Sequence, residues 1–364
     1  MENVKVTVWL STYNQEPYVA QALDSILMQK TNFPFEIIAA DDCSTDRTQE
    51  IILDYQKRYP DMIIPYFTPE NIGGCRKLTN CIDAGLFRGE YLSYLEGDDY
   101  WLGEDRLQTL ADFLDMHPEY AAVAHQRDMV NEQGEFICPD VPEILLDKPF
   151  TIENFLEGWD YADFGTVFRN YYKADGAKYH SLLRASRNVI DFQDMFMMQD
   201  HGPVYVTSKC FGAYRCARAA GATNYNSITT QPQRSMDHIR ICRAVESFYH
   251  GHYNLSPMIH REQYKLLFAI VDSMQKEIYQ EARHYITDSD LIRDMPEVLY
   301  LSLRGRRFKN FRFALQMLTL KERAVILPKV ISFGGKRVLE KIMHQEHANC
   351  SKIRGFVVAE QEQI

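Results

Sequence analysis

Strand-like and helix-like segments alternate through the first hundred residues of the chain, and this alternation restricts the fold more than any other feature. Short apolar, β-branched runs typical of buried strands lie near residues 4–10, 36–40, 63–67 and 91–95. Segments with apolar residues at helical spacing follow the first three runs. Because parallel strands are joined by helical crossovers, we predict an α/β fold with a doubly wound, mostly parallel sheet.

Polar and acidic residues directly follow three of the predicted strands. They are Ser11–Glu16, Asp41-Asp42 and Glu96-Gly97-Asp98-Asp99. Ligands of open α/β sheets bind beyond the carboxyl ends of the strands, so we expect these clusters to line one crevice. Carboxylates a few ångströms apart repel one another, and a shared divalent cation or hydrogen-bond donors must balance them. Mg²⁺ or Mn²⁺ bridging to a diphosphate is the simplest solution.

The alternation weakens after about residue 125. We expect one strand at 165–169, a helix at 191–200, and two short strands at 204–206 and 212–215. The polar stretch 223–233 carries no apolar periodicity and indicates a domain boundary. We therefore predict a first domain over 1–222, with parts 1–130 and 131–222, and a mostly helical C-terminal region over 234–364.

Charge is distributed unevenly along the chain. The formal net charge is −10, but residues 301–356 hold 13 Lys and Arg against 3 Asp and Glu. An acidic body argues against a general nucleic-acid binder, so we predict no nucleic-acid partner. A basic helix with Phe and Leu on its other face is typical of an element that lies on an anionic membrane surface. The alternative is a helical domain that packs against the acidic body.

The sequence predicts a cytoplasmic protein. Its N-terminus lacks a basic region followed by an apolar one, and no window approaches 18 consecutive apolar residues. Eight cysteines without a Cys-x-x-Cys pair are more typical of free thiols in a reducing compartment than of disulfides or a zinc site.

Four motifs in this order resemble the nucleotide-binding half of the bacterial family 2 glycosyltransferases, which have the GT-A fold and invert the transferred sugar. The motifs are Ser11-Thr12-Tyr13-Asn14-Gln15-Glu16, Asp41-Asp42-Cys43-Ser44-Thr45-Asp46, Asn71-Ile72-Gly73-Gly74-Cys75-Arg76 and Glu96-Gly97-Asp98-Asp99-Tyr100-Trp101. The resemblance implies that residues 1–130 bind a nucleotide-sugar donor and that residues 131–222 form the acceptor side.

The resemblance also implies roles for single residues at the nucleotide. Ser11, Tyr13 and Glu16 would meet the base and ribose, with Tyr13 stacked on the base. Asp42 would accept a hydrogen bond from the base, and a buried acceptor discriminates strongly among bases. Arg76 would offset the charge of the diphosphate. Without the motif, each of these residues would be read as part of a turn, a helix cap or a solvated helix face.

The acidic motif after the fourth strand corresponds to the family's Asp-x-Asp, with Glu96 in place of the first Asp. The resemblance implies that Asp98 binds the metal and that Asp99 faces the donor sugar or its ribose. Glu96 would then contact the ribose, or it would contact the residues that bind the metal without binding the metal itself.

Inversion requires a base opposite the leaving diphosphate. In the family this base is an Asp at the start of a helix in the second half, and Asp191 fits that position best. Asp194, one turn further on, is the alternative base. If Asp191 has no catalytic role, it is a carboxylate at a helix N-terminus that interacts with the helix dipole. Many members have a His two residues after a Tyr-Arg pair, where this chain has Ala217. Arg215 or Arg218 would serve in place of that His.

These features predict a metal-dependent, inverting glycosyltransferase that uses a UDP-sugar. The expected acceptor is a hydroxyl of a glycan or a lipid-linked oligosaccharide in bacterial surface polysaccharide synthesis, at the inner face of the cell membrane. One alternative is a sugar nucleotidyltransferase, which would need a glycine-rich basic loop after the first strand. The other alternative is a non-catalytic protein that binds nucleotide-sugars.

Overall fold

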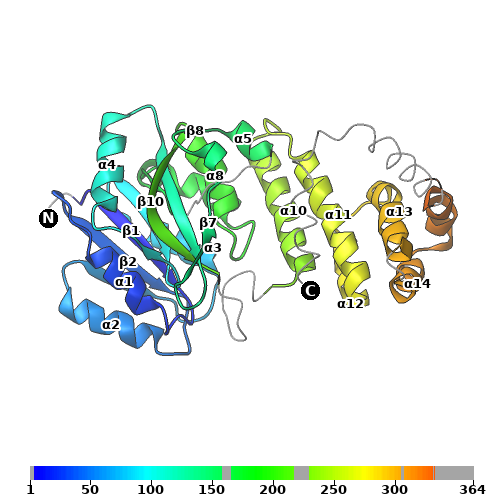
Figure 1. Cartoon of the computed structure of the whole chain (residues 1–364), viewed down its shortest axis with the longest axis horizontal. Coiled ribbons are helices and arrows are strands. Elements are labelled where there is room, and N and C mark those ends of the chain that lie inside the picture. The colour runs from blue at the N-terminus through cyan, green and yellow to red at the C-terminus, as the bar shows by residue number, and fades with distance from the viewer. Residues whose placement is uncertain (1–3, 158–164, 217–228, 305–306, 331, 333–364) are drawn as a thin grey trace. The chain divides into compact units, whose positions relative to one another are not determined.

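The computed structural model describes residues 4–157, 165–216, 229–304, 307–330 and 332. Within this range the chain forms two compact units. One comprises residues 1–230 with 237–258, and the other comprises 231–236 with the residues from 259 onward. The first unit contains a large sheet with helices on both faces, and the second unit is helical (Figure 1).

Parallel strands form the first half of the sheet, in the order β3-β2-β1-β4. These strands are β1 (Val6–Thr12), β2 (Phe35–Asp41), β3 (Ile63–Phe67) and β4 (Tyr91–Glu96). Three helices connect them in turn: α1 (Val19–Leu27), α2 (Thr48–Arg58) and α3 (Gly74–Asp83). The α/β fold predicted from the alternation is thereby confirmed.

The second half of the sheet contains both parallel and antiparallel pairs of strands, which differs from the mostly parallel sheet predicted from the sequence. Its order continues β4-β9-β6-β10-β5, with β9 antiparallel to both of its neighbours and β6 parallel to β10. Its strands are β5 (Tyr100–Trp101), β6 (Ala122–Val130), β7 (Phe136–Pro139), β8 (Lys148–Phe150), β9 (Val167–Arg169) and β10 (Val204–Arg215). A mostly parallel arrangement therefore describes β1 to β4 rather than the whole sheet.

Short helices accompany this second half. They are α4 (Arg106–Met116), η1 (Glu143–Leu145), α5 (Ile152–Leu156), α6 (Tyr172–Asp175), η3 (Gly176–Tyr179), α7 (His180–Leu183) and α8 (Asp191–Gln199). Helix α8 begins at Asp191 and occupies the place where the sequence predicted a helix at 191–200.

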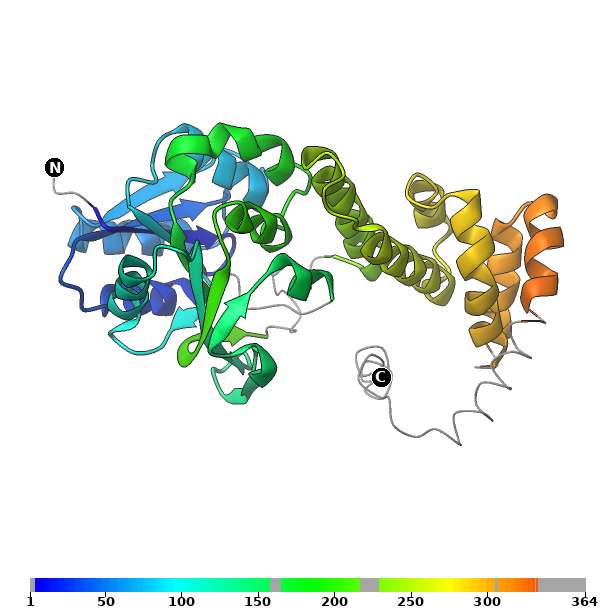
Figure 2. The same cartoon turned by 90° about the horizontal axis from the view of Figure 1, so that it is seen from above.

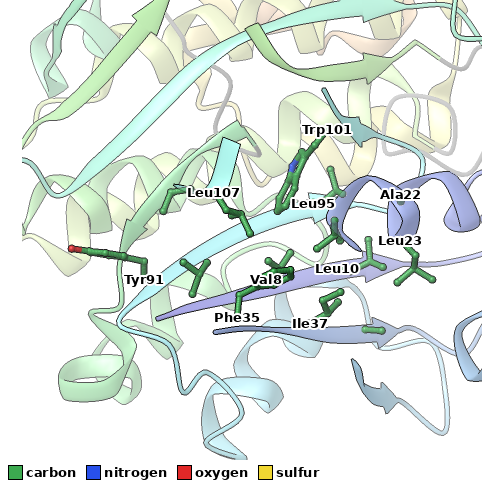
Figure 3. Packing of buried hydrophobic residues seen from close by; sticks show 14 of the residues in the cluster. Val8, Leu10, Ala22, Leu23, Phe35, Ile37, Tyr91, Leu95, Trp101 and Leu107 are labelled. Atoms are coloured by element: carbon green, nitrogen blue, oxygen red, sulfur yellow. The ribbon is translucent and has the colours of Figure 1, made fainter. Parts of the chain in front are cut away.

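One face of the sheet is buried under α1, α2 and α4. Val8 and Leu10 of β1 pack with Phe35 and Ile37 of β2 and with Leu23 of α1, as Figure 3 shows. The alternation of side chains along a strand sends the intervening residue Trp9 to the opposite face. There its ring meets Tyr94 edge-on at 5.1 Å between centroids, and both side chains are fully buried.

The two short strands predicted at 204–206 and 212–215 are one strand, β10. Its register against β6 shifts between Thr207 and Cys210 and again between Cys210 and Gly212. These irregularities place exposed residues in the middle of the strand, and this exposed polar stretch looked like a break in the sequence.

The second unit is built from helices that pack in a row, coloured yellow to orange in Figure 2. Its helices are α11 (Ser256–Ser273), α12 (Lys276–Ala282), α13 (Asp288–Arg304) and α14 (Phe308–Met317). Most of the preceding helix, α10 (Gln231–Phe248), belongs to the first unit. Residues 223–228 of the expected boundary, and residues 333–356 of the basic segment, lie outside the described residues. None of the described helices is long and apolar enough to cross a bilayer.

Candidate active site

The register of the parallel strands brings the predicted clusters to one edge of the sheet. Ser11 of β1 lies beside Glu96 of β4, and the next residue, Thr12, lies beside Asp41 of β2. The main-chain N–H of Gly97 donates to Ser11 O at 2.9 Å, and that of Asp42 donates to Thr12 O at 3.0 Å. The polar clusters that follow β1, β2 and β4 in the sequence therefore lie next to one another at the carboxyl edge of the sheet.

The loops after β1 and β2 are joined by hydrogen bonds into one assembly. The main-chain N–H of Asn14 donates to Ser44 Oγ at 2.8 Å, and that of Gln15 donates to Thr48 Oγ1 at 2.8 Å. The main-chain N–H of Glu16 donates to Asp46 at 3.0 Å. Tyr13 and Glu16 remain partly exposed on this assembly, so both side chains are accessible to a ligand.

Asp42 uses its carboxylate to hold the loop between β3 and α3. Its oxygens accept from the main-chain N–H groups of Ile72 at 2.9 Å and Gly73 at 2.8 Å, and from Thr68 Oγ1 at 3.1 Å. A carboxylate has about four lone-pair sites, so one acceptor direction remains for a base. Any contact with the base is thus additional to a structural role that the sequence did not reveal.

Lys77 lies fully buried beneath both loops, and no motif singled it out. Its ammonium donates to the main-chain oxygens of Thr12 and Ala40, both at 3.0 Å. Burial lowers the pKa of Lys77, whereas the charges of Asp42 and Asp41 act in the opposite direction. Lys77 precedes the buried Cys81 by one helical turn, which was the available signal that it faces inward.

The acidic motif after β4 is almost completely removed from water. Asp98 and Asp99 are 6% and 5% exposed. Burial raises the pKa of Asp98 to about 6, and burial with the charge of Asp98 raises the pKa of Asp99 to about 8. The pKa of Glu96 is also raised well above its ordinary value, by burial first and then by Asp98, Asp99 and Asp191.

Gln15 fixes Asp98 in place. Its Nε2 donates to Asp98 Oδ1 at 2.9 Å, while its own Oε1 is buried without a partner among the described residues. A Cβ atom on Gly97 would lie 2.4 Å from Gln15 Oε1 and 2.8 Å from Thr12 Cγ2. The glycine of the motif is therefore required by the close approach of the loop after β1.

Arg215, the last residue of β10, forms hydrogen bonds with the main chain of the acidic motif and with neighbouring segments. Its guanidinium donates to the main-chain oxygens of Asp98 and Glu132, at 2.8 and 2.7 Å, and to Gln21 Oε1 at 2.7 Å. Most of its N–H groups are used in this way, so the sequence-based suggestion that Arg215 contacts a diphosphate does not fit the structure. Arg218 and Ala217 lie outside the described residues.

The position of Asp191 is fixed by the docking of its preceding segment on α3. The main-chain N–H of Cys75 donates to Arg187 O at 3.1 Å, and that of Gly74 donates to Asn188 Oδ1 at 3.3 Å. Gly73 has φ +88°, and a Cβ there would lie 2.4 Å from Arg187 Cγ. Asp191 is exposed as the first residue of α8, and its charge contributes to the raised pKa values of Glu96 and Cys75.

Asp194, the alternative base, is fully buried. Its Oδ1 accepts from the hydroxyl groups of Tyr171 and Tyr172, the latter at 3.2 Å. Burial raises the pKa of Asp194 to about 7. An acceptor hydroxyl cannot reach this carboxylate without rearrangement of the core, whereas Asp191 is open to solvent.

Arg76 is accessible on the surface, whereas His125 and His201 have contacts within the fold. Arg76 is exposed on the first turn of α3, beside the loop that Asp42 holds. His125 is fully buried and contacts Arg106 Nε at 3.0 Å through its Nε2. Burial lowers the pKa of His125 well below its ordinary value, so it is a neutral core residue. His201 contacts Tyr179 at 3.1 Å.

The donor set of the acidic motif fits a hard divalent cation. Carboxylate oxygens suit Mg²⁺ and Mn²⁺. Burial is the main cause of the raised pKa values of Asp98 and Asp99, and the nearby arginines Arg215 and Arg127 act in the opposite direction. Among the described residues, no three acidic, His or Cys side chains form a ready cation site. Mg²⁺ commonly binds through one or two carboxylates completed by substrate phosphates, and Asp98 matches that pattern.

The basic segment contributes to the helical unit as far as it is described. Ala314 and Leu318 are buried, and Asn310 Nδ2 donates to Val271 O at 3.0 Å. Arg307 pairs with Asp272. The apolar side of α14 therefore packs inside the unit, while basic side chains remain exposed at Lys309, Arg312, Lys321 and Lys329.

Comparison with known proteins agrees with this geometry. Residues 7–173 match the model of the family described as glycosyl transferase family 2. The crystal structure of Staphylococcus aureus TarS residues 1–349 in complex with UDP-GlcNAc superimposes with a TM-score of 0.50 and 18% identity, over 85% of this chain and 90% of that chain. The family match thus covers residues 7–173, and the structural likeness shows a GT-A fold.

Two sequence relatives each match about a third of the chain. A Mycobacterium tuberculosis protein described as uncharacterized is 42% identical over 123 residues, which are 34% of this chain and 35% of the relative. The poly(ribitol-phosphate) β-N-acetylglucosaminyltransferase TarS of S. aureus is 33% identical over 117 residues, 31% of this chain and 19% of the relative. The match thus spans about a third or less of these relatives' lengths.

Proposed function

We propose that the protein is an inverting glycosyltransferase that transfers a sugar from a UDP-sugar to a hydroxyl of a glycan or lipid-linked acceptor. The observation that carries this proposal is that the acidic residues after β4 and the acidic residue that begins α8 are close enough for their charges to interact. Glu96, Asp98 and Asp99 lie at the end of β4, and the charge of Asp191 on α8 reaches Glu96. Such an arrangement suits a donor site facing a base.

In the proposed reaction, Asp191 accepts the proton of the acceptor hydroxyl. The hydroxyl oxygen then forms a bond to the anomeric carbon, the bond from that carbon to the diphosphate oxygen breaks, and UDP leaves with the electron pair. General-base assistance of this kind contributes about 10²–10⁴-fold to rate. Asp191 suits the role because its carboxylate is exposed and its helix is fixed to α3.

The donor would lie against the loops after β1, β2 and β4. Tyr13, Ser11 and Glu16 would face the base and ribose, and Arg76 would approach the diphosphate. Asp98 would hold Mg²⁺ or Mn²⁺, which neutralises charge on the departing diphosphate. Asp99 and Glu96 would contact the donor sugar or ribose.

The test is UDP release from a panel of UDP-sugars by the full chain, with and without Mn²⁺, together with calorimetry of UDP binding. We expect Asp98→Ala to remove metal-dependent binding and turnover. We expect Asp191→Asn to lower turnover by at least 10²-fold, a loss of about the size of general-base assistance, while UDP binds as to the wild type. Asp175→Asn, an exposed carboxylate outside the crevice, is the matched control and should turn over normally. Full turnover by Asp191→Asn would contradict the assigned base.

The same assay separates the alternatives. A sugar nucleotidyltransferase would release pyrophosphate and need a nucleoside triphosphate, and the loop Ser11–Glu16 contains no Gly, Lys or Arg to bind one. A non-catalytic binder would bind UDP-sugars without release of UDP, and Asp191→Asn would behave as the wild type. Metal-dependent UDP release that requires Asp191 excludes both.

We also propose that the protein is cytoplasmic and that residues 301–356 meet an anionic membrane surface. The exposed residues Lys309, Arg312, Lys321 and Lys329 support this, since each basic residue near such a surface contributes about 1 kcal/mol. The full chain should sediment with phosphatidylglycerol vesicles at low salt and not with phosphatidylcholine vesicles. Equal sedimentation of the fourfold Ala variant would contradict the proposal.

A further inference from the structure

A chain of buried hydroxyl groups connects the strand that carries the acidic motif to the helix that carries Asp191. Tyr94 of β4 donates to the hydroxyl of Tyr172 at 3.1 Å, and Tyr172 donates to Asp194 Oδ1 at 3.2 Å. Tyr94 lies two residues before Glu96, and Asp194 lies one helical turn after Asp191. The connection thus begins and ends beside the two halves of the candidate site.

All groups in this chain are excluded from water. Tyr94 and Asp194 are fully buried, and Tyr172 is 6% exposed. Hydrogen bonds in series polarise one another, and a carboxylate at the end of the series accepts more strongly than a neutral group. The connection is therefore stiffer than one isolated hydrogen bond between a strand and a helix.

The rings of the tyrosines are themselves fixed. Tyr94 packs edge-on against Trp9 at 5.1 Å and against Phe168 at 5.0 Å between centroids. Tyr171, which also donates to Asp194, stacks on His201 at 4.8 Å. Movement of Asp194 would disturb several packed rings, so the first two turns of α8 are held in one position relative to β4.

We propose that Asp194, through Tyr172 and Tyr94, is a positioning residue that sets the distance between Asp191 and the donor site. This inference rests on the proposed function. An error of 1 Å in the placement of a reacting group can cost about 10²-fold in rate, so a base on a short helix needs such a connection. The chain touches neither donor nor acceptor, and its loss should slow the chemical step without weakening donor binding.

The experiment compares Tyr172→Phe, Tyr94→Phe and their double variant with the wild type, in kcat, in KM for the UDP-sugar and in thermal unfolding. Tyr179→Phe is the matched control, because Tyr179 is also buried and donates to an aspartate, Asp200, at the other end of α8, at 2.9 Å. We expect kcat to fall about tenfold in each single variant, and the double variant to be no slower. KM should change less than twofold.

Asp194→Asn retains the accepting oxygen, so its kcat should stay within about threefold of the wild-type value. Asp194→Leu removes that oxygen, so its kcat should fall. Unchanged kcat in Tyr172→Phe, additive losses in the double variant, or an equal loss in Tyr179→Phe would each overturn the inference. If the wild type transfers no sugar, the proposed function fails instead. Amide exchange of residues 188–194 then decides the inference, since the chain predicts faster exchange in Tyr172→Phe and not in Tyr179→Phe.

Discussion

Arg215 donates its Nε–H to the main-chain oxygen of Asp98 over 2.8 Å, and its own main-chain N–H donates to Asp99 Oδ1 over the same distance. The last residue of β10 therefore holds both aspartates that follow β4. The guanidinium also lies over the ring of Tyr18, 4.6 Å from its centroid. One buried side chain thus joins the acidic motif to β10 and to the segment that begins α1.

Replacement of Arg215 by Met should destabilise the fold and the acidic motif together. The main-chain oxygens of Asp98 and Glu132 would lose their donors while remaining buried, and each such loss costs about 1–3 kcal/mol. We expect the free energy of unfolding in urea to fall by about 3 kcal/mol. Arg184→Met, at an exposed arginine that pairs loosely with Asp83 at 3.8 Å, is the control. Equal urea midpoints for the two variants would contradict this role.

The substitution Lys77→Met should weaken nucleotide binding, although the Lys77 side chain is fully buried. The variant removes the donor shared by Thr12 and Ala40 and the cation nearest to Asp41 and Asp42, so the two loops lose their common anchor. We expect the affinity for UDP, measured by calorimetry, to fall about tenfold, and the free energy of unfolding to fall by about 2 kcal/mol. Lys173→Met, at an exposed lysine, should leave both unchanged. Wild-type UDP affinity in Lys77→Met would show that the anchor is dispensable.

The first half of the fold and the meeting of the polar clusters at one edge of the sheet could be predicted from the sequence, because both follow from local patterns. Apolar runs such as 36–40 mark buried strands, and polar residues directly after them mark the carboxyl edge of a parallel sheet. The second half could not be predicted in the same way. Residues 204–215 form one strand whose exposed middle breaks the apolar pattern. The strand expected at 165–169 is present as β9, but its antiparallel pairing with β4 and β6 has no local signal.

The supporting residues of the site could not be predicted, because their roles depend on tertiary contacts. The resemblance suggests Arg215 in place of a missing His, but in the structure main-chain oxygens occupy most of its donors. Lys77 lies outside the motifs, and its bonds to the main-chain oxygens of Thr12 and Ala40 depend on the tertiary fold. Asp194 is the alternative to Asp191 in the sequence, and in the structure Tyr171 and Tyr172 donate to its buried carboxylate, whereas Asp191 is exposed.

Gly97→Ala should disrupt the acidic motif through one methyl group. The added Cβ would lie 2.4 Å from Gln15 Oε1, so Gln15 must move and its hydrogen bond to Asp98 must lengthen. We expect a loss of about 1–3 kcal/mol in unfolding free energy and at least tenfold weaker UDP binding in the presence of Mn²⁺. Gly74→Ala, whose Cβ would meet its nearest atoms at 3.7 Å, is the matched control. Normal UDP binding by Gly97→Ala would mean that Gln15 does not position Asp98.

The buried carboxyl of Asp194 should make the stability of the protein depend on pH. Burial raises its pKa to about 7 in the folded state, and the charge of Asp191 acts in the same direction, whereas the hydrogen bonds from Tyr171 and Tyr172 act in the opposite direction. The pKa of an aspartate in an unfolded chain is about 3.9. Folding therefore favours the protonated form. Its contribution is complete below about pH 4 and is lost as the pH rises through about 7, with a total near 4 kcal/mol. Urea unfolding of the wild type and Asp194→Asn at pH 5 and pH 8 measures this contribution. The stability of the wild type relative to the variant should be about 3 kcal/mol lower at pH 8, whereas parallel changes in both proteins would show that Asp194 has the same pKa folded and unfolded.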